Sequence, residues 1–165
     1  MLRAPEPSDL EKMYEWENDP DRLLHGRTGL PYSKAFLSDY ITTYNEMALS
    51  SGHVRFIVSD HKMLPLGILD LYDIDLTSRK AFISVYIDSN YRNRGIAKSA
   101  VTEAICFARD QLGMNQLIAI VNEENQISLS LFKKVGFTHI ALLPQWVRAV
   151  DGSLKSASLL AKYLG

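Results

Sequence analysis

The spacing of hydrophobic and polar residues changes several times along the chain, and each spacing predicts an element. Apolar residues recur at helical intervals in four segments, 8–18, 33 to about 50, 95–112 and 126–135. Alternating or continuously apolar runs predict strands over 53–59, 66–74, 81–87, 117–121, 137–150 and 156–164, with a possible short first strand over 2–4. Helices and strands interleaved in this order predict an α+β fold, with α/β character in its later half.

Turn and cap residues set several expected boundaries. Ser8, followed three residues later by Glu11, predicts a capping box at the start of the first helix. The run Asn18-Asp19-Pro20 ends that helix, and Gly113 suits the position just after the third one. Asp151-Gly152 predicts the turn between the last two strands.

Composition is typical of an ordinary soluble globular protein. The chain has 165 residues, 18 Lys+Arg, 19 Asp+Glu and one cysteine, with no repeat or linker, so we expect a single domain over residues 1–165. A net charge of −1 argues against nucleic acid or an anionic membrane as a partner. The sequence contains no run of 18 apolar residues, so no membrane span is predicted. The N-terminus lacks the pattern of a signal peptide. The lone Cys106 is expected to be a buried hydrophobe, which with the absence of disulfides favours a cytoplasmic location.

The stretch most informative about chemistry is ISVYIDSNYRNRGIA, residues 83–97. A strand ends and a helix begins here, across a loop that contains Arg92, Arg94 and Gly95. Such a junction presents free backbone amides at the positive end of a helix dipole, and is therefore suited to a pyrophosphate. A solvated basic turn and a site for a different phosphate ligand are the alternatives.

Two motifs in order carry a family resemblance. The run VYIDSNYRNRGIAKSAVTEAICFA resembles the acetyl-CoA motif of the GNAT superfamily of N-acetyltransferases, and VNEENQISLSLFKKVGF resembles its second motif. The opening LRAPEPSDLEKMYEWENDPD is similar to the branch with ribosomal-protein N-terminal and spermidine N-acetyltransferases. The resemblance implies a mixed sheet, mostly antiparallel with a splayed central parallel pair, flanked by about four helices. It also implies acetyl-CoA as the cofactor, and it implies no metal.

Carried over position by position, the resemblance assigns residues to the cofactor. Three residues would line the splayed edge of the central strand: Val85, Tyr86 and Ile87. The pyrophosphate loop would comprise Arg92, Asn93, Arg94, Gly95, Ile96 and Ala97, with Lys98 following. From the second motif, Asn125 would contact the pantetheine arm. Asn122 would either help position that turn or serve only in turn and cap chemistry.

Phe132 departs from the family pattern. Many members carry a tyrosine at this position, and its hydroxyl can protonate the leaving CoA thiolate. The phenyl ring of Phe132 can pack against the cofactor arm but has no proton to give, so no catalytic residue is assigned. Tyr86 and Tyr91 are the nearby hydroxyls in the sequence, with side-chain directions that the sequence does not define.

The expected activity is transfer of an acetyl group from acetyl-CoA to a primary amine, by direct attack in a ternary complex. The acceptor would be a polyamine-like small molecule or a protein N-terminal amine, and the chain could form a homo-oligomer. The alternative, motivated by Phe132, is a catalytically weakened CoA-binding sensor or regulatory module. A base would have to deprotonate the amine; Asp70 and Asp73 are three residues apart, and would lie on opposite faces of a regular strand.

Charge is unevenly distributed along the sequence. Residues 6–21 contain seven acids and one lysine, a local balance of −6, whereas residues 79–98 carry five basic residues and one acid, a balance of +4. This distribution predicts an anionic cofactor on one side and a cationic amine on the other. A solvated acidic helix face is the plainer interpretation of the first segment.

Overall fold

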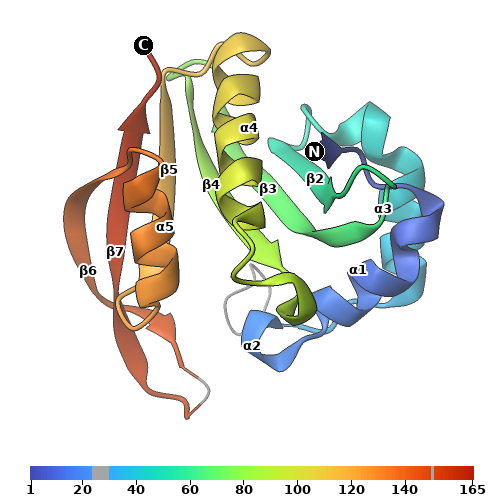
Figure 1. Cartoon of the computed structure of the whole chain (residues 1–165), viewed down its shortest axis with the longest axis horizontal. Helices are drawn as coiled ribbons and strands as arrows, with labels where there is room; N and C mark the ends of the chain where they lie inside the picture. Colours follow the sequence, from blue (N-terminus) through green and yellow to red (C-terminus); the bar gives the residue numbers. More distant parts are fainter. Residues whose placement is uncertain (24–29, 150) are drawn as a thin grey trace.

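The computed structural model describes residues 1–23, 30–149 and 151–165, and its described residues form one seven-stranded sheet covered by helices (Figure 1). The strands are β1 (Leu2–Arg3), β2 (His53–Ser59), β3 (Pro65–Asp75), β4 (Lys80–Ile87), β5 (Gln116–Asn122), β6 (Thr138–Arg148) and β7 (Leu154–Tyr163). The helices are α1 (Leu10–Glu17), α2 (Pro20–Leu23), α3 (Lys34–Met47), α4 (Ile96–Asp110) and α5 (Gln126–Lys134). Two short 3₁₀ turns, η1 (Pro7–Asp9) and η2 (Ser89–Tyr91), precede α1 and α4.

The sheet has the order β1-β2-β3-β4-β5-β7-β6 and is antiparallel at every junction except one. The exception is β4 and β5, which run parallel and pair through three residues of each strand, from Lys80↔Gln116 to Phe82↔Ile118. The expected mixed sheet with a central parallel pair is confirmed, as is the α+β class.

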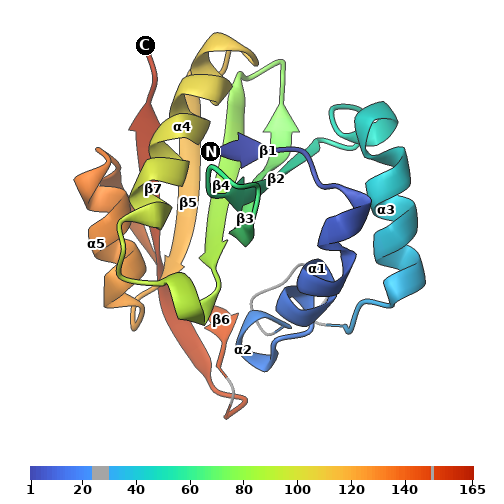
Figure 2. The ribbon, with the colours of Figure 1, turned by 45° about the vertical axis from the view of Figure 1, so that its right-hand side comes forward.

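Helices cover both faces of the sheet. One core joins the buried stripe of α4, centred on Val101 and Ala104, to α5 and to inward side chains of the central strands such as Leu69 and Leu117. A second, smaller core joins α1 and α3 to β2 and β3 through Ile57 and Ile68. Figure 2 shows α1–α3 grouped at one end of the sheet, with α4 and α5 over its middle and its other end. The cofactor motifs therefore belong to the larger core, and the acidic N-terminal segment to the smaller one.

The first helix begins differently from the prediction. The capping box is formed by Glu6 and Asp9, not by Ser8 and Glu11. Pro7 is the cause, because it occupies the first position of a helical turn and places the N-cap at the residue before it. Pro20 acts in the same way: it follows the end of α1 and opens α2, which the sequence pattern did not predict.

Cys106 is exposed, so the expectation of a buried thiol is wrong. Ile105 lies at one lateral edge of the buried α4 stripe, and the 100° rotation to the next residue turns the side chain of Cys106 to solvent.

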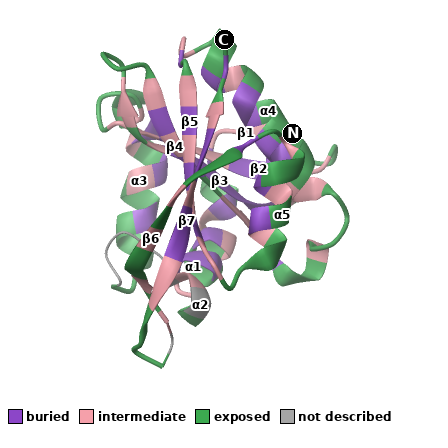
Figure 3. Cartoon of the chain, turned by 90° about the vertical axis from the view of Figure 1, so that its left-hand side faces the viewer, coloured by how far each residue is buried: buried purple, intermediate pink, exposed green. Residues whose placement is uncertain are grey.

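The β6 edge of the sheet is largely exposed, as Figure 3 shows. The prediction of a strand over 137–150 holds for Thr138–Arg148, while Val150 lies outside the described residues. Among the described residues, no helix is both long enough and apolar enough to cross a membrane.

Candidate functional site

The central feature of the candidate site is the gap that opens between β4 and β5. Beyond Phe82 and Ile118, β4 continues to Ile87 paired only with β3, and β5 continues to Asn122 paired only with β7, as far as the described residues show. The facing edges therefore carry backbone N–H and C=O groups without a strand partner. A ligand with amide groups along its length, such as a pantetheine arm, can pair with such edges. Val85, Tyr86 and Ile87 all lie in this splayed part, as expected.

The loop that follows β4 has the backbone conformation of an anion site. Asn93 and Gly95 adopt left-handed conformations, with φ values of 62° and 77°, and α4 begins directly after Gly95. Left-handed residues within a loop can turn successive amides toward one side, and the first turn of α4 adds backbone amides without helical partners. A Cβ built on Gly95 would meet no atom within 4 Å, so the backbone at Gly95 is open to a ligand. These residues fit the pyrophosphate of acetyl-CoA.

The arginines of the loop are partly occupied by contacts within the protein. Arg92 donates through Nε to the carbonyl oxygen of Ile87 at 2.8 Å, and its guanidinium lies 5.5 Å from the centroid of the Tyr86 ring. Arg94 donates to the carbonyl of Asn90 at 3.0 Å and lies over the ring of Tyr91. Both remain exposed, so their charges still act on the loop.

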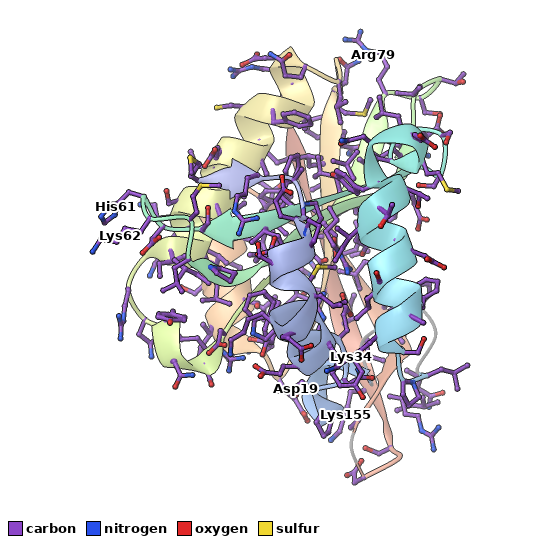
Figure 4. The ribbon with its side chains drawn as sticks, turned by 90° about the vertical axis from the view of Figure 1, so that its right-hand side faces the viewer. Asp19, Lys34, His61, Lys62, Arg79 and Lys155 are labelled. Atoms are coloured by element: carbon purple, nitrogen blue, oxygen red, sulfur yellow. The ribbon has the colours of Figure 1, made fainter. Side chains whose placement is uncertain are left out.

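The basic patch expected over residues 79–98 is split by the fold. Arg79 directly precedes β4 and Lys80 begins it, eight and seven residues before its last residue, Ile87, whereas Arg92, Arg94 and Lys98 follow that end. Figure 4 shows Arg79 at one end of the molecule and Asp19 near the other. Arg79 instead donates to the carbonyl oxygen of Gly113 at 2.7 Å. The sum of +4 therefore overstates the charge near the cofactor loop.

The two asparagines of the second motif perform turn and cap chemistry. Asn125 is the N-cap of α5, and its side-chain oxygen accepts from the amide of Ser128 at 3.0 Å. Asn122, at the end of β5, accepts from the amide of Glu124 at 3.0 Å. Both stand at the β5 side of the gap. Their contacts with a cofactor stay predictions, and such contacts would use the side-chain amide nitrogens, because both side-chain oxygens already accept bonds within the protein.

Phe132 is a core residue. Its side chain is 3% exposed, and its ring packs edge-to-face on Phe137 with centroids 5.0 Å apart. It belongs to the larger core together with residues of α4 and β5. Contact of this ring with a cofactor arm stays a prediction.

Tyr86 projects from the splayed part of β4 toward the N-terminal helices. Its ring lies 5.0 Å from the guanidinium of Arg22 on α2 and 6.2 Å from the ring centroid of Trp16 on α1, and Arg92 approaches from the loop. Burial, followed by the nearby carboxylate of Asp19, raises the pKa of the Tyr86 phenol above its usual range. The phenol is therefore protonated at neutral pH.

A buried hydrogen bond ties α1 to the loop. The indole Nε1 of Trp16 donates to the carboxylate of Asp88 at 2.9 Å, and the same carboxylate accepts from the amide of Asn90 at 2.9 Å. These donors hold the pKa of Asp88 below its usual range against the opposing effect of burial. The bond joins residues 72 positions apart, so it was not visible in the sequence.

A buried cluster of charges lies under α1–α3. Arg55 on β2 forms ion pairs with Asp70 on β3, through Nε at 2.7 Å, and with Glu17 on α1. Arg22 also pairs with Glu17 at 3.2 Å and lies 3.7 Å from Asp70. His53 completes the cluster with its Nε2 at 3.2 Å from Asp70.

The cluster determines whether the two candidate bases, Asp70 and Asp73, can accept a proton. Burial alone would raise the pKa of Asp70, but the Arg55 guanidinium and the His53 hydrogen bond hold it well below the usual range. Such a carboxylate is a very weak base. Asp73 is exposed and has a φ of 48°, at an irregularity of the β3–β4 pairing, so the regular alternation assumed for these two residues does not extend to it.

Ion pairs within the protein also compensate much of the negative charge of the acidic N-terminal segment, residues 6–21. Asp9 is bound by Arg3 at 2.6 Å. Glu11 pairs with Lys34 and Glu15 with Lys12, in addition to the buried pairs of Glu17. Asp9, Glu11, Glu15 and Glu17 are thus paired within the part of the protein that the structure describes.

A groove of about 570 Å³ lies on another side of the same loop. Its walls are Met1, the end of β2 with the β2–β3 turn, and the first turn of α4; His61 protrudes at that turn (Figure 4). Tyr91 and Arg94 line this groove, but no residue of β5 or α5 does. The groove is therefore separate from the β4–β5 gap, and Tyr91 faces the groove.

The chain is similar to proteins of known activity. A family model described as "Acetyltransferase (GNAT) domain" matches residues 1–138. A spermidine N(1)-acetyltransferase of Vibrio cholerae is 23% identical over 136 residues, covering 82% of this chain and 77% of the relative. The enzyme of the same name from Escherichia coli K12 is 27% identical over 140 residues, covering 83% and 72%. The crystal structure of spermidine N-acetyltransferase from Vibrio cholerae with CoA and spermine superposes with a TM-score of 0.85 at 21% identity, covering 99% of this chain and 95% of that one.

Proposed function

The chain belongs to the GNAT acetyltransferase family, and we propose that it acetylates a primary amine of a polyamine by direct attack on bound acetyl-CoA. It is accordingly an acetyl-CoA-dependent N-acetyltransferase. The choice of a polyamine over a protein N-terminus is supported by the relatives named spermidine N(1)-acetyltransferase, at 23% and 27% identity. We place the reaction in the cytoplasm, in keeping with a free thiol at Cys106.

The observation that carries the proposal is the β4–β5 gap with the left-handed loop at its end. The unpaired edge of Ile83–Ile87 offers amide donors to the cofactor arm and to the oxygen of a thioester carbonyl. The turn from Asn93 to Ile96 offers amides to the pyrophosphate. One ligand that combines a pyrophosphate, an amide-containing arm and a thioester fits both features.

When bound, acetyl-CoA supplies an activated acetyl thioester. The residues of the chain must then hold the thioester in the gap, admit a neutral amine nitrogen beside it and accept the proton that this nitrogen loses. Asp70 does not fit the last task, because its charge is held in the buried cluster. Tyr86 lies in the strand segment that borders the gap, with Arg22 beside its ring on the side of α1 and α2, and we assign this side to the acceptor.

The test is a turnover assay with acetyl-CoA and spermidine, spermine, an aminoglycoside and an N-terminal peptide, with release of free thiol as the readout. We expect turnover with the polyamines to exceed both the hydrolysis background and the peptide rate. Calorimetry with CoA is run in parallel. CoA binding without turnover on any amine would favour the sensor or regulatory module instead.

The alternative has its own discriminating variant. Phe132→Tyr restores the hydroxyl that many members of the family carry at this position. A wild-type chain that is nearly inactive and gains strongly from Phe132→Tyr supports the weakened sensor. Robust wild-type turnover with little gain excludes it.

A further inference from the structure

The absence of a hydroxyl at Phe132 leaves the departing thiolate without the proton donor that many members of the family have. The ring is 3% exposed and carries no hydroxyl, so any acid that serves this step must reach the gap from another element. Protonation matters because a thiolate expelled into a site shielded from water is a poorer leaving group than a thiol.

Two tyrosines flank the splayed part of β4, and the structure separates them. Tyr91 stacks with Arg94 and lines the groove of about 570 Å³, which shares no residue with β5 or α5. Tyr86 lies within β4 itself, opposite Ile68 of β3 and four residues beyond Phe82, where pairing with β5 ends. Only Tyr86 of this pair belongs to the strand segment that borders the gap.

The surroundings of Tyr86 suit a proton donor. Its ring is held by the guanidinium groups of Arg22 and Arg92 at 5.0 and 5.5 Å, one from the acceptor side and one from the cofactor loop. Two cations beside the ring stabilise the negative charge that develops when the phenol gives up its proton. Any tyrosine phenol is protonated at neutral pH, and burial raises the pKa of Tyr86 further above that range.

We propose that Tyr86 donates its hydroxyl proton to the CoA sulfur during acetyl transfer, in place of the hydroxyl absent at Phe132. This inference rests on the proposed function. The amine nitrogen forms a bond to the acetyl carbon, the carbon–sulfur bond breaks and its electron pair passes to sulfur. Sulfur takes the proton of Tyr86, and the phenolate takes the proton that the nitrogen loses on becoming an amide. The net products are the N-acetyl amine and free CoA thiol.

The experiment is steady-state kinetics of the full chain with acetyl-CoA and spermidine, comparing the wild type with Tyr86→Phe. Phenylalanine keeps the ring between the two arginines and removes only the hydroxyl. Tyr163→Phe is the matched control, because Tyr163 is 70% exposed and pairs with Gln116, at the closed end of the β4–β5 pair. We expect Tyr86→Phe to lower kcat by about 100-fold. The KM values for both substrates should stay within about three-fold, and Tyr163→Phe should match the wild type.

Two further readouts distinguish proton donation from packing. The alkaline limb of the kcat–pH profile, caused by loss of the phenol proton, should disappear in Tyr86→Phe. Adding Phe132→Tyr to Tyr86→Phe should restore kcat at least ten-fold, because it returns a hydroxyl to the position where many relatives have one.

The inference is overturned if Tyr86→Phe keeps more than half of the wild-type kcat, or loses kcat with an unchanged pH profile. A double variant with the melting temperature of Tyr86→Phe and no gain in rate overturns it as well. A wild-type chain inactive on every amine contradicts the proposed function, and the role of Tyr86 with it. An active wild type whose rate does not depend on the Tyr86 hydroxyl contradicts only the role of Tyr86 and leaves the proposed function intact.

Discussion

Replacement of Arg55 by methionine tests the buried charge cluster directly. In the wild type, Arg55 and Arg22 balance the carboxylates of Glu17 and Asp70, and the side chains of all four are between 7% and 16% exposed. Arg55→Met leaves one guanidinium for two buried carboxylates. An uncompensated buried charge of this kind costs about 3–5 kcal/mol, and methionine fills much of the volume, so little of the loss comes from a cavity.

The assay is urea unfolding at pH 7, followed by circular dichroism, with a double-mutant cycle. Asp70→Asn alone leaves an excess cation, whereas Arg55→Met with Asp70→Asn restores the balance. The double variant should therefore be more stable than the sum of the two single losses implies, by roughly 1–3 kcal/mol. Lys12→Met is the control: its pair with Glu15 is exposed, and its loss should cost less than about 1 kcal/mol.

The pH dependence gives the sign of the effect. In the wild type the pKa of Asp70 is depressed, so its stabilising contribution is complete above the unfolded pKa, about 3.9, and is lost as the pH falls through the folded pKa. Without Arg55, burial dominates and raises that pKa. The deficit of Arg55→Met should accordingly be largest near neutral pH and shrink as the pH falls toward 4. A deficit under about 1 kcal/mol at pH 7, or one that grows on acidification, would show that Arg55 does not compensate the buried carboxylates.

Three other perturbations address the loop, its link to α1 and the open edge of the sheet. Gly95→Asp places a carboxylate beside the amides that would bind the pyrophosphate, and calorimetry should show CoA binding weakened more than ten-fold. Gly95→Ala has the same left-handed strain, about 1–2 kcal/mol, but no charge, so it should bind CoA far more tightly than Gly95→Asp does. Equal affinities of the two variants for CoA would show that the charge of the added carboxylate is not what weakens binding. Trp16→Phe leaves the Asp88 carboxylate without its indole donor and should cost about 1–3 kcal/mol in urea unfolding, while a neutral result would show that water replaces the indole. Trp146 lies on the open β6 edge with its side chain 57% exposed, so Trp146→Lys should change the free energy of unfolding by less than about 0.5 kcal/mol in urea; a larger loss would show that the indole is packed.

The elements most readily predicted were those with a persistent period. The α4 stripe was placed correctly because burial on one side enforces a spacing that a linear sequence displays. The strands β2 and β3 were placed correctly because each is a largely apolar run bounded by turn residues, although helices cover both of their faces. Helix starts were less predictable. Pro7 fixes a turn before Ser8, and the choice between two acid-bearing cap patterns depends on backbone geometry as well as residue type.

The loop of the candidate site was predictable for a different reason. A glycine at the junction of a strand and a helix, with arginines nearby, follows from local chemistry, and Gly95 is indeed left-handed. The Trp16–Asp88 bond and the Arg55–Asp70 pair depend instead on tertiary structure. The latter could have been found by aligning the two strands, since Arg55 and Asp70 are direct partners in the β2–β3 register.

The acidic N-terminal segment shows why charge summed along the sequence is a poor guide to ligand attraction. Charges attract a distant amine only where nearby ions have not compensated them, and Asp9, Glu11, Glu15 and Glu17 all have cationic partners. Asp19 differs in position, because its carboxylate helps to raise the pKa of the Tyr86 phenol and therefore acts at the border of the gap. In the proposed mechanism the charges that matter are therefore those of a few residues around Tyr86, namely Arg22, Arg92 and Asp19, and not the overall balance of two segments.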